Sequence, residues 1–154
     1  MKYLKSNFMG IIDISEKPCV NRTAEAAGKI ILSQKSIDAI KNNTVKKGNP
    51  LPVAEIAGMN AAKQTSFLIP HCHQLILNAV SLDFNVMNDG VEVNCNVRTY
   101  GRTGVEMEAI NAVLIALSTI WDMVKYLEKD ADGQYPYTAI EQVRVIKKEK
   151  GENR

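Results

Sequence analysis

The sequence predicts an α+β domain in which an antiparallel sheet carries its helices on one face. Apolar residues alternate cleanly over residues 91–97, as in a half-buried strand, and recur at helical spacing over 51–68 and 105–128. The expected elements follow in the order strand, helices, strand, strand, helix, strand. That order is the split βαβ, or ferredoxin-like, arrangement.

Turn and capping residues delimit the elements of the first half. We expect, in order, a strand from about 20 to 32, a short helix that ends near Asn43, a turn at 46–50, and a helix over 51–68 that ends before Pro70. Ser33 is a favoured N-cap for the short helix because its hydroxyl accepts a backbone N–H that the first turn leaves unpaired. Pro52 suits the first turn of the next helix, where no N–H donor is needed.

A hairpin signal organises the second half. Asn88–Asp89–Gly90 favours a tight turn between a strand at 75–87 and the alternating strand at 91–97. A helix from about 105 to 128 and a last strand at 139–147 complete the fold. The long helix is apolar on more than one face, which is typical of a helix buried on several sides. One small sheet cannot cover it, so we expect the protein to self-associate with closed symmetry.

Composition narrows the class of protein. The 154 residues predict a single domain over 1–154, with frayed ends at about 1–9 and 149–154. A net charge of +2 argues against a nucleic-acid partner. Three cysteines without paired spacing, Cys19, Cys72 and Cys95, argue for a reducing compartment. The start does not resemble a signal peptide, and no apolar run reaches transmembrane length, so we expect a cytoplasmic protein with no membrane partner.

Ionisable residues on the long apolar helix form the main candidate site. Glu108 and Asp122 are fourteen residues apart, roughly 3.9 turns, and so return to nearly the same face. Lys125 lies one turn beyond Asp122. Because burying such groups is costly, we interpret them as an acid/base site. Two simpler interpretations stay open: Glu106 and Glu108 as acids that favour the helix dipole, and Asp122 with Lys125 as a surface ion pair.

His71, Cys72 and His73 form a second candidate group, after the second helix. In an extended segment both imidazoles would point to one side and the thiol to the other, which admits a zinc site. The further ligands that zinc needs lack a recognisable spacing, so hydrogen bonding or proton transfer by the histidines is favoured. Cys72 has no visible base that would activate it as a nucleophile, which favours a packing role.

Basic residues are candidates for binding phosphate. Arg22, Lys47, Lys63 and Arg102 each fit a solvated surface charge, but together they could neutralise a polyphosphate. The turn at 101–104 is similar to a phosphate-binding turn at a helix N-terminus. It lacks the full glycine-rich loop pattern, so this signal is weak when taken alone.

Several of these segments together resemble one family, the cyclic pyranopterin monophosphate synthases of molybdenum cofactor biosynthesis. The resemblance covers roughly residues 10–148. The segments that carry it are Asp13–Ser15 with Lys17 and Arg22, Lys47–Gly48, Ile56–Gly58, Ala61–Lys63, Leu68–Pro70 with Cys72–His73, Gly101–Ala109 and Thr119–Lys125. The Glu-Met-Glu stretch at 106–108, with its flanks, is specific enough that chance explains it poorly.

The resemblance implies a ferredoxin-like subunit in a hexamer of three dimers, with active sites at the dimer interfaces. It implies conversion of 3′,8-cyclo-7,8-dihydro-GTP into cyclic pyranopterin monophosphate with release of pyrophosphate, and no metal or redox cofactor. By matching position, Asp122 is the acid/base residue. The other residues that it assigns are a catalytic set of Lys47, Glu106, Glu108, Lys125 and His73, substrate contacts from His71, Cys72, His73, Met107 and Glu108, and a further lysine at Lys147 or Lys148.

The chemistry of the reaction fits these residue types. Rebuilding a purine as a pterin needs several proton transfers, for which carboxylates and lysines are suitable. A departing pyrophosphate needs positive charge, which gives Lys63, Arg22 and Arg102 a hypothetical role in substrate binding.

The chain departs from the family pattern at several positions. Gln74 stands where proline is usual, Asn49 where aspartate is usual, and His71 where the family is more often apolar. The tail Lys150–Arg154 lacks the usual glycine-rich, lysine-bearing ending. None of these changes removes a matched catalytic residue, so we expect an enzyme. The alternatives are a non-catalytic oligomer of the same fold that binds a pterin or nucleotide, and a purely structural oligomer.

Overall fold

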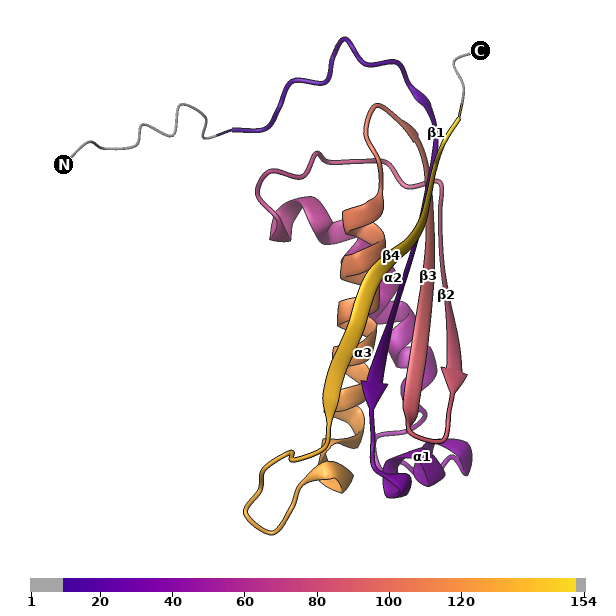
Figure 1. Ribbon diagram of the computed structural model, residues 1–154, viewed down its shortest axis with the longest axis vertical. Coiled ribbons are helices and arrows are strands. Elements are labelled where there is room, and N and C mark those ends of the chain that lie inside the picture. The colour runs from indigo at the N-terminus through magenta and orange to yellow at the C-terminus, as the bar shows by residue number, and fades with distance from the viewer. Residues whose placement is uncertain (1–9, 152–154) are drawn as a thin grey trace, which may run out of the picture.

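The computed structural model describes residues 10–151, which form a four-stranded antiparallel sheet with helices packed on one face (Figure 1). The elements are β1 (Val20–Ile31), α1 (Gln34–Lys41), α2 (Pro50–Leu68), β2 (Ala79–Val86), β3 (Gly90–Gly101), α3 (Glu106–Glu128) and β4 (Ala139–Lys150). The strand order is β2-β3-β1-β4, so β1 and β3 are central. The predicted ferredoxin-like α+β fold is confirmed.

Two of the helices begin at a residue whose side chain caps them. The Ser33 hydroxyl accepts the backbone N–H of Ser36 and so caps α1. The side chain of Asn49 accepts the backbone N–H of Leu51 at 3.1 Å and caps α2, which has proline at its start. Helix α3 begins at Glu106 with no side-chain cap.

Three strands differ from their predicted extents. Strand β3 continues past the alternating residues 91–97 to Gly101. The strand expected from residue 75 begins at Ala79, because the chain before it is a loop in which Asn78 Oδ1 accepts the backbone N–H of Tyr100 at 2.8 Å. The last strand continues past residue 147 to Lys150, which pairs with Arg22 of β1. Residues 149 and 150, expected to fray, are therefore part of the sheet, whereas 1–9 and 152–154 lie outside the described residues.

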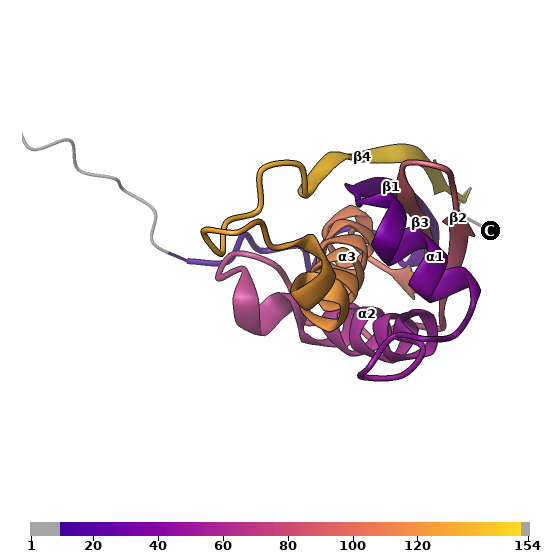
Figure 2. The same cartoon turned by 90° about the horizontal axis from the view of Figure 1, so that it is seen from below.

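The core lies between the sheet and α3. Figure 2 shows the sheet curving around α3, with α2 packed beside that helix. The helix presents a fully buried face to β1 and β3, made of Ala109, Ala112, Val113, Ala116, Leu117, Ile120 and Val124. Gly28 lets β1 approach closely, since a Cβ there would lie 2.8 Å from a Val113 methyl group. The position of α3 is therefore fixed by the tight packing of its buried face.

Helix α3 is also long and apolar enough to cross a membrane by length and composition, with a mean hydropathy of 1.4 over its most apolar window. The prediction that no segment reaches such a length is wrong for this helix. Its most apolar face packs against β1, β3 and α2, which is the position of a core helix in a globular domain.

Candidate active site

The ionisable residues of α3 lie at its two ends. Glu106 and Glu108 occupy the first turn, and Asp122 and Lys125 lie near the end. Fourteen residues at about 1.5 Å each separate Glu108 from Asp122 by about 21 Å along the axis. Within one chain they therefore form two groups. We call Lys47, Asp122 and Lys125 the Asp122 centre, and Glu106, Glu108 and Lys148 the Glu106 cluster.

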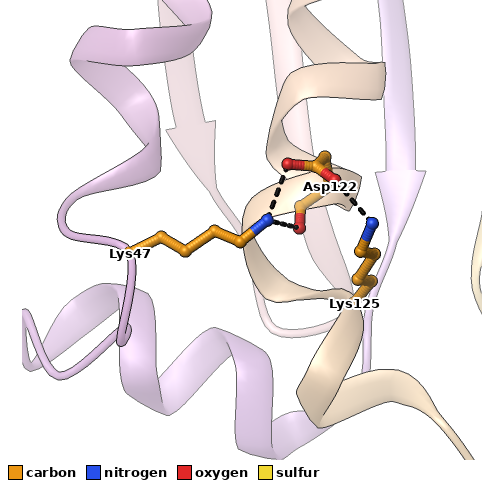
Figure 3. A network of polar contacts seen from close by, with 3 residues as sticks. All are labelled: Lys47, Asp122 and Lys125. Carbon is orange, nitrogen blue, oxygen red and sulfur yellow. Dashed lines mark hydrogen bonds and ion pairs between the residues drawn. The ribbon is translucent and has the colours of Figure 1, made fainter.

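The Asp122 centre is a carboxylate held between two ammonium groups (Figure 3). Lys47 Nζ lies 2.8 Å from Asp122 Oδ2 and donates to the Asp122 backbone carbonyl at 3.0 Å. Lys125 Nζ lies 2.7 Å from Asp122 Oδ1. Lys47 comes from the loop before α2, whereas Lys125 comes from the next turn of α3.

These contacts fix the charge of the centre. Hydrogen bonds from Lys125 and Lys47 lower the pKa of Asp122 to about 2, and the carboxylate raises the pKa of Lys125. The Asp122 side chain is 55% exposed, so a ligand can reach it. At neutral pH the centre therefore offers an ionised proton acceptor beside ammonium donors, the groups that general acid–base catalysis uses.

A tight turn delivers Lys47 to this centre. The N–H of Gly48 donates to the carbonyl of Val45 at 2.9 Å, and Gly48 has a φ of 92°, which favours glycine. The next residue is Asn49, the cap of α2. The chain thus passes from the turn straight into a packed helix, and Lys47 projects from the turn toward α3.

Glu106 pairs with a lysine of the last strand. Lys148 Nζ lies 2.6 Å from Glu106 Oε1. Partial burial raises the pKa of Glu106, but Lys148, a backbone hydrogen bond and the charge of Arg22 together hold it below its ordinary value. Lys147 pairs instead with Glu149 at 2.8 Å, because neighbouring residues of a strand point to opposite faces. Of the two lysines left open by the sequence, Lys148 is the one that contacts a predicted site residue.

Glu108 lies in a different environment from Glu106. It is only 5% exposed, and burial together with the charge of Glu106 raises its pKa. Burial raises the pKa of the Cys72 thiol, and the nearby negative charge of Glu108 raises it further. A thiol with a raised pKa stays protonated and is a poor nucleophile, which supports the packing role expected for Cys72.

The two histidines bind the segment that precedes β1. His71 Nδ1 donates to the carbonyl of Gly10 and His73 Nε2 to that of Ile12, both at 2.6 Å, so these nitrogens carry protons. The loop is not extended, since the N–H of Cys72 donates to the carbonyl of Ile69 at 3.0 Å. Among residues 10–151, no three His, Cys, Asp or Glu side chains are grouped to hold a metal ion.

The basic residues do not converge on one point. Arg22 donates to the carbonyl of Arg102 at 3.2 Å, and Arg102 donates to that of Lys17 at 3.0 Å. Arg102 and His73 line a cavity of about 650 Å³ between residues 11–15 and the end of β3. Lys63 lines a separate pocket of about 420 Å³ between α2 and β2. Lys47 belongs to the Asp122 centre.

Two tyrosines near the Asp122 centre were not among the predicted site residues. Tyr126 Oη accepts the backbone N–H of Lys46 at 2.9 Å. Tyr135 meets Trp121 edge to face, with ring centroids 5.7 Å apart. The spacing of four residues on a helix could have placed Tyr126 beside Asp122. Tyr135 lies in a loop, where spacing does not predict which residues are neighbours.

The family whose sequence profile matches this chain is described as the MoaC family, over residues 11–151. The chain belongs to the MoaC family. A protein of Archaeoglobus fulgidus, named as a probable cyclic pyranopterin monophosphate synthase, is 46% identical over 151 residues, or 98% of this chain and 97% of that protein. A Thermoplasma volcanium protein of the same name is 51% identical over 142 residues, 92% and 95% of the two chains.

A third relative of the MoaC-family chain carries a different name. It is the probable cyclic pyranopterin monophosphate synthase accessory protein of Methanothermobacter thermautotrophicus, 50% identical over 140 residues, which cover 91% of this chain and 88% of that protein. The family resemblance stated from the sequence is thus confirmed. At two positions where the chain departs from the MoaC pattern, the residue present makes a hydrogen bond. Asn49 caps α2, and His71 binds the carbonyl of Gly10.

Proposed function

We propose that the protein is a cyclic pyranopterin monophosphate synthase of molybdenum cofactor biosynthesis. It converts 3′,8-cyclo-7,8-dihydro-GTP into cyclic pyranopterin monophosphate and releases pyrophosphate. The family match over residues 11–151 and the relatives of that name support this function. The observation that carries it is the Asp122 centre, where an ionised carboxylate is held between two ammonium groups.

The Asp122 centre supplies the proton transfers of this proposal. Asp122 accepts protons from the substrate, and Lys47 or Lys125 donates protons to the substrate. The reaction breaks and makes bonds at ring nitrogens and carbons, each of which needs a proton to leave or arrive. Glu108 serves as a second proton donor, because its raised pKa lets it hold a proton at higher pH than an ordinary glutamate.

The complete site lies between subunits in this proposal. The Asp122 centre and the Glu106 cluster are too far apart on one α3 to hold one small substrate, and a partner subunit can bring the opposite end of its own helix. Apolar side chains exposed on α2 and α3 support such an assembly: Val53, Ile56, Phe67, Leu68, Met107, Leu114 and Ile115. We expect the hexamer of three dimers that the resemblance implies.

The remaining predicted residues bind the substrate in this scheme. Arg22 and Arg102 lie together beside the turn at 101–104, which favours a role in holding phosphate. His71, Cys72, His73 and Met107 contact the substrate, and Lys63 acts from its separate pocket. The reaction uses no metal, so adding a chelator leaves the rate unchanged. With a soluble nucleotide as substrate and three free cysteines, the cytoplasm is the expected compartment.

A product assay tests the proposal. Purified protein is incubated with 3′,8-cyclo-7,8-dihydro-GTP, and pyrophosphate and cyclic pyranopterin monophosphate are measured. Formation of both supports the enzyme. Binding without product identifies the non-catalytic alternative, and a melting temperature that the substrate does not change identifies a structural oligomer.

Mixing inactive variants tests the shared site. Asp122→Asn and Glu108→Gln each remove one half of the site. Subunits of the two variants, unfolded and reassembled together, regain activity when each active site takes its halves from different subunits. If activity stays absent although mixed oligomers form, the site does not lie between subunits.

A further inference from the structure

Tyr126 connects the loop that carries Lys47 to the helix that carries Asp122. Its Oη accepts the backbone N–H of Lys46 at 2.9 Å, and the Lys46 ammonium lies 5.1 Å from the centroid of its ring. Tyr126 follows Asp122 by four residues, so both side chains lie on the same face of α3, one turn apart. One face of α3 thus carries both the Asp122 carboxylate and Tyr126, which binds the loop that supplies Lys47.

Lys47 contributes a long, flexible side chain to the Asp122 centre. Its flexible side chain is half exposed and reaches across from a loop to α3. Its ammonium contacts both the carboxylate and the backbone carbonyl of Asp122. A lysine loses side-chain entropy when it is held in one arrangement, so the position of its backbone decides how often the contacts form.

The Tyr126 contact acts on that backbone directly. The peptide group of Lys46 is bonded to the phenol, and Lys47 is the next residue. Tyr126 therefore fixes where the Lys47 side chain starts. A shift of about 1 Å in a catalytic group can reduce a rate by about a hundredfold, so a loose loop would be costly for the reaction.

We propose that Tyr126 is a positioning residue, which holds the loop of Lys47 so that the Lys47 ammonium stays on Asp122. The inference rests on the proposed function of the Asp122 centre and adds a residue to it. The competing explanation is that Tyr126 only ties the loop to α3 for stability. In that case its loss would weaken the fold and leave the Lys47–Asp122 contact as it is.

A double-mutant cycle separates the two explanations. Tyr126→Phe keeps the ring and removes only the hydroxyl, and Lys47→Met removes the ammonium. We expect Tyr126→Phe to lower kcat/KM for product formation by about tenfold in the wild-type background, and by less than about twofold when Lys47→Met is present, because coupled residues are non-additive. Equal losses in both backgrounds would overturn the proposal.

A titration supplies a readout that needs no turnover. Hydrogen bonds from both lysines hold the pKa of Asp122 below its ordinary value. Carbon NMR of the Asp122 carboxyl group can follow this titration in each variant. Tyr126→Phe should raise the pKa of Asp122 toward the value that the same titration gives for Lys47→Met. An unchanged titration in Tyr126→Phe would contradict the inference even if the rate falls. If wild-type protein makes no product, the proposed function fails, and this titration still decides the role of Tyr126.

Two further variants complete the design. Tyr137→Phe removes the same hydroxyl from a tyrosine that is 78% exposed, and it should change neither kcat/KM nor the Asp122 titration. Lys46→Met keeps the backbone N–H and removes the ammonium over the ring, so we expect a smaller loss than in Tyr126→Phe. It also tests the loop if Tyr126→Phe does not fold. A loss in Tyr137→Phe as large as in Tyr126→Phe would overturn the proposal.

Discussion

The two ends of α3 place carboxylates in opposite electrostatic surroundings. At the first turn, Glu108 is buried beside the negative charge of Glu106, and burial raises its pKa. Near the other end, Asp122 is more than half exposed between two ammonium groups, and its pKa falls to about 2. The two ends of one helix thus shift the pKa of the same functional group in opposite directions.

Glu128 shows that burial alone does not set this difference. It is 8% exposed, yet its carboxylate accepts the Ser33 N–H at 3.0 Å, the Ser33 hydroxyl at 2.7 Å and the Thr138 hydroxyl at 2.5 Å, together with the hydroxyl of Ser36. Burial raises its pKa, but these hydrogen bonds outweigh it and the net shift is downward. Hydrogen bonds to a buried carboxylate can thus reverse the direction in which burial shifts its pKa.

The largest expected effect comes from neutralising the anion at the exposed end. Asp122→Asn should lower the rate of product formation by at least about a thousandfold, because the acceptor for proton transfer is lost. Fold and assembly should stay intact, as judged by circular dichroism and sedimentation. Asp83→Asn, an exposed aspartate on β2, is the matched control. A wild-type rate in Asp122→Asn would remove Asp122 from the mechanism.

Replacing the buried Glu108 by a neutral residue should have opposite effects on activity and on stability. Glu108→Gln should lower the rate by about a hundredfold. At pH 7 it should raise the melting temperature by about 2–4 °C for each kcal/mol of removed charge penalty. Since the pKa of Glu108 is raised by folding, its ionisation costs stability as the pH rises above 4.5. The gain should therefore vanish below that pH. A lower melting temperature at pH 7 would show that the ionised carboxylate stabilises the fold.

A substitution of Glu128 tests how much the hydrogen bonds to this buried carboxylate stabilise the fold. Glu128→Gln should lower the free energy of unfolding at pH 7 by about 1–3 kcal/mol, because hydrogen bonds to a buried charge are lost. Its pKa is lowered by folding, so its contribution is complete above 4.5 and is lost as the pH falls through the folded value. Urea unfolding should show the difference from wild type shrinking in acid. The exposed Glu55→Gln should change little, and an equal effect there would contradict this account.

The smallest expected effect concerns the lysine beside Glu106. Lys148→Met should raise the pKa of Glu106. It should lower the rate by about tenfold, because the anionic substrate loses the positive charge of the Lys148 ammonium. Lys147→Met is the control, because Lys147 pairs with Glu149 instead. Steady-state kinetics on both variants measures the contrast. If Lys147→Met lowers the rate more than Lys148→Met, the assignment of the two lysines is reversed.

The sequence predicted most of the fold because local patterns and tertiary packing agree. Ser33, the hairpin glycine Gly90 and the alternation of β3 each mark their element. The alanines of β1 were ambiguous by propensity, but small residues are what the close packing of that strand against α3 requires. The start of β2 was placed too early, because the loop before it has the apolar composition of a strand.

The site was only partly predictable. Asp122 and Lys125 are three residues apart on a helix, so their contact follows from spacing. Lys47 is 75 residues away. Its charge marked it only as a candidate for binding phosphate, and its place in the catalytic set came from the family resemblance. The shared face of Glu108 and Asp122 suggested one site, although the axial distance makes two. The environment of Glu128 was not predicted, since its donors come from residues on both sides of α3 in the chain.

The position of β1 in the sheet also has a consequence for the newly made chain. One edge of β1 pairs with β3 and the other with β4, which spans Ala139–Lys150. During synthesis the second edge therefore stays open until β4 has been translated. An unpaired strand edge invites pairing with other chains, and contacts this distant in sequence form slowly. A ribosome that stalls before β4 would release an aggregation-prone polypeptide.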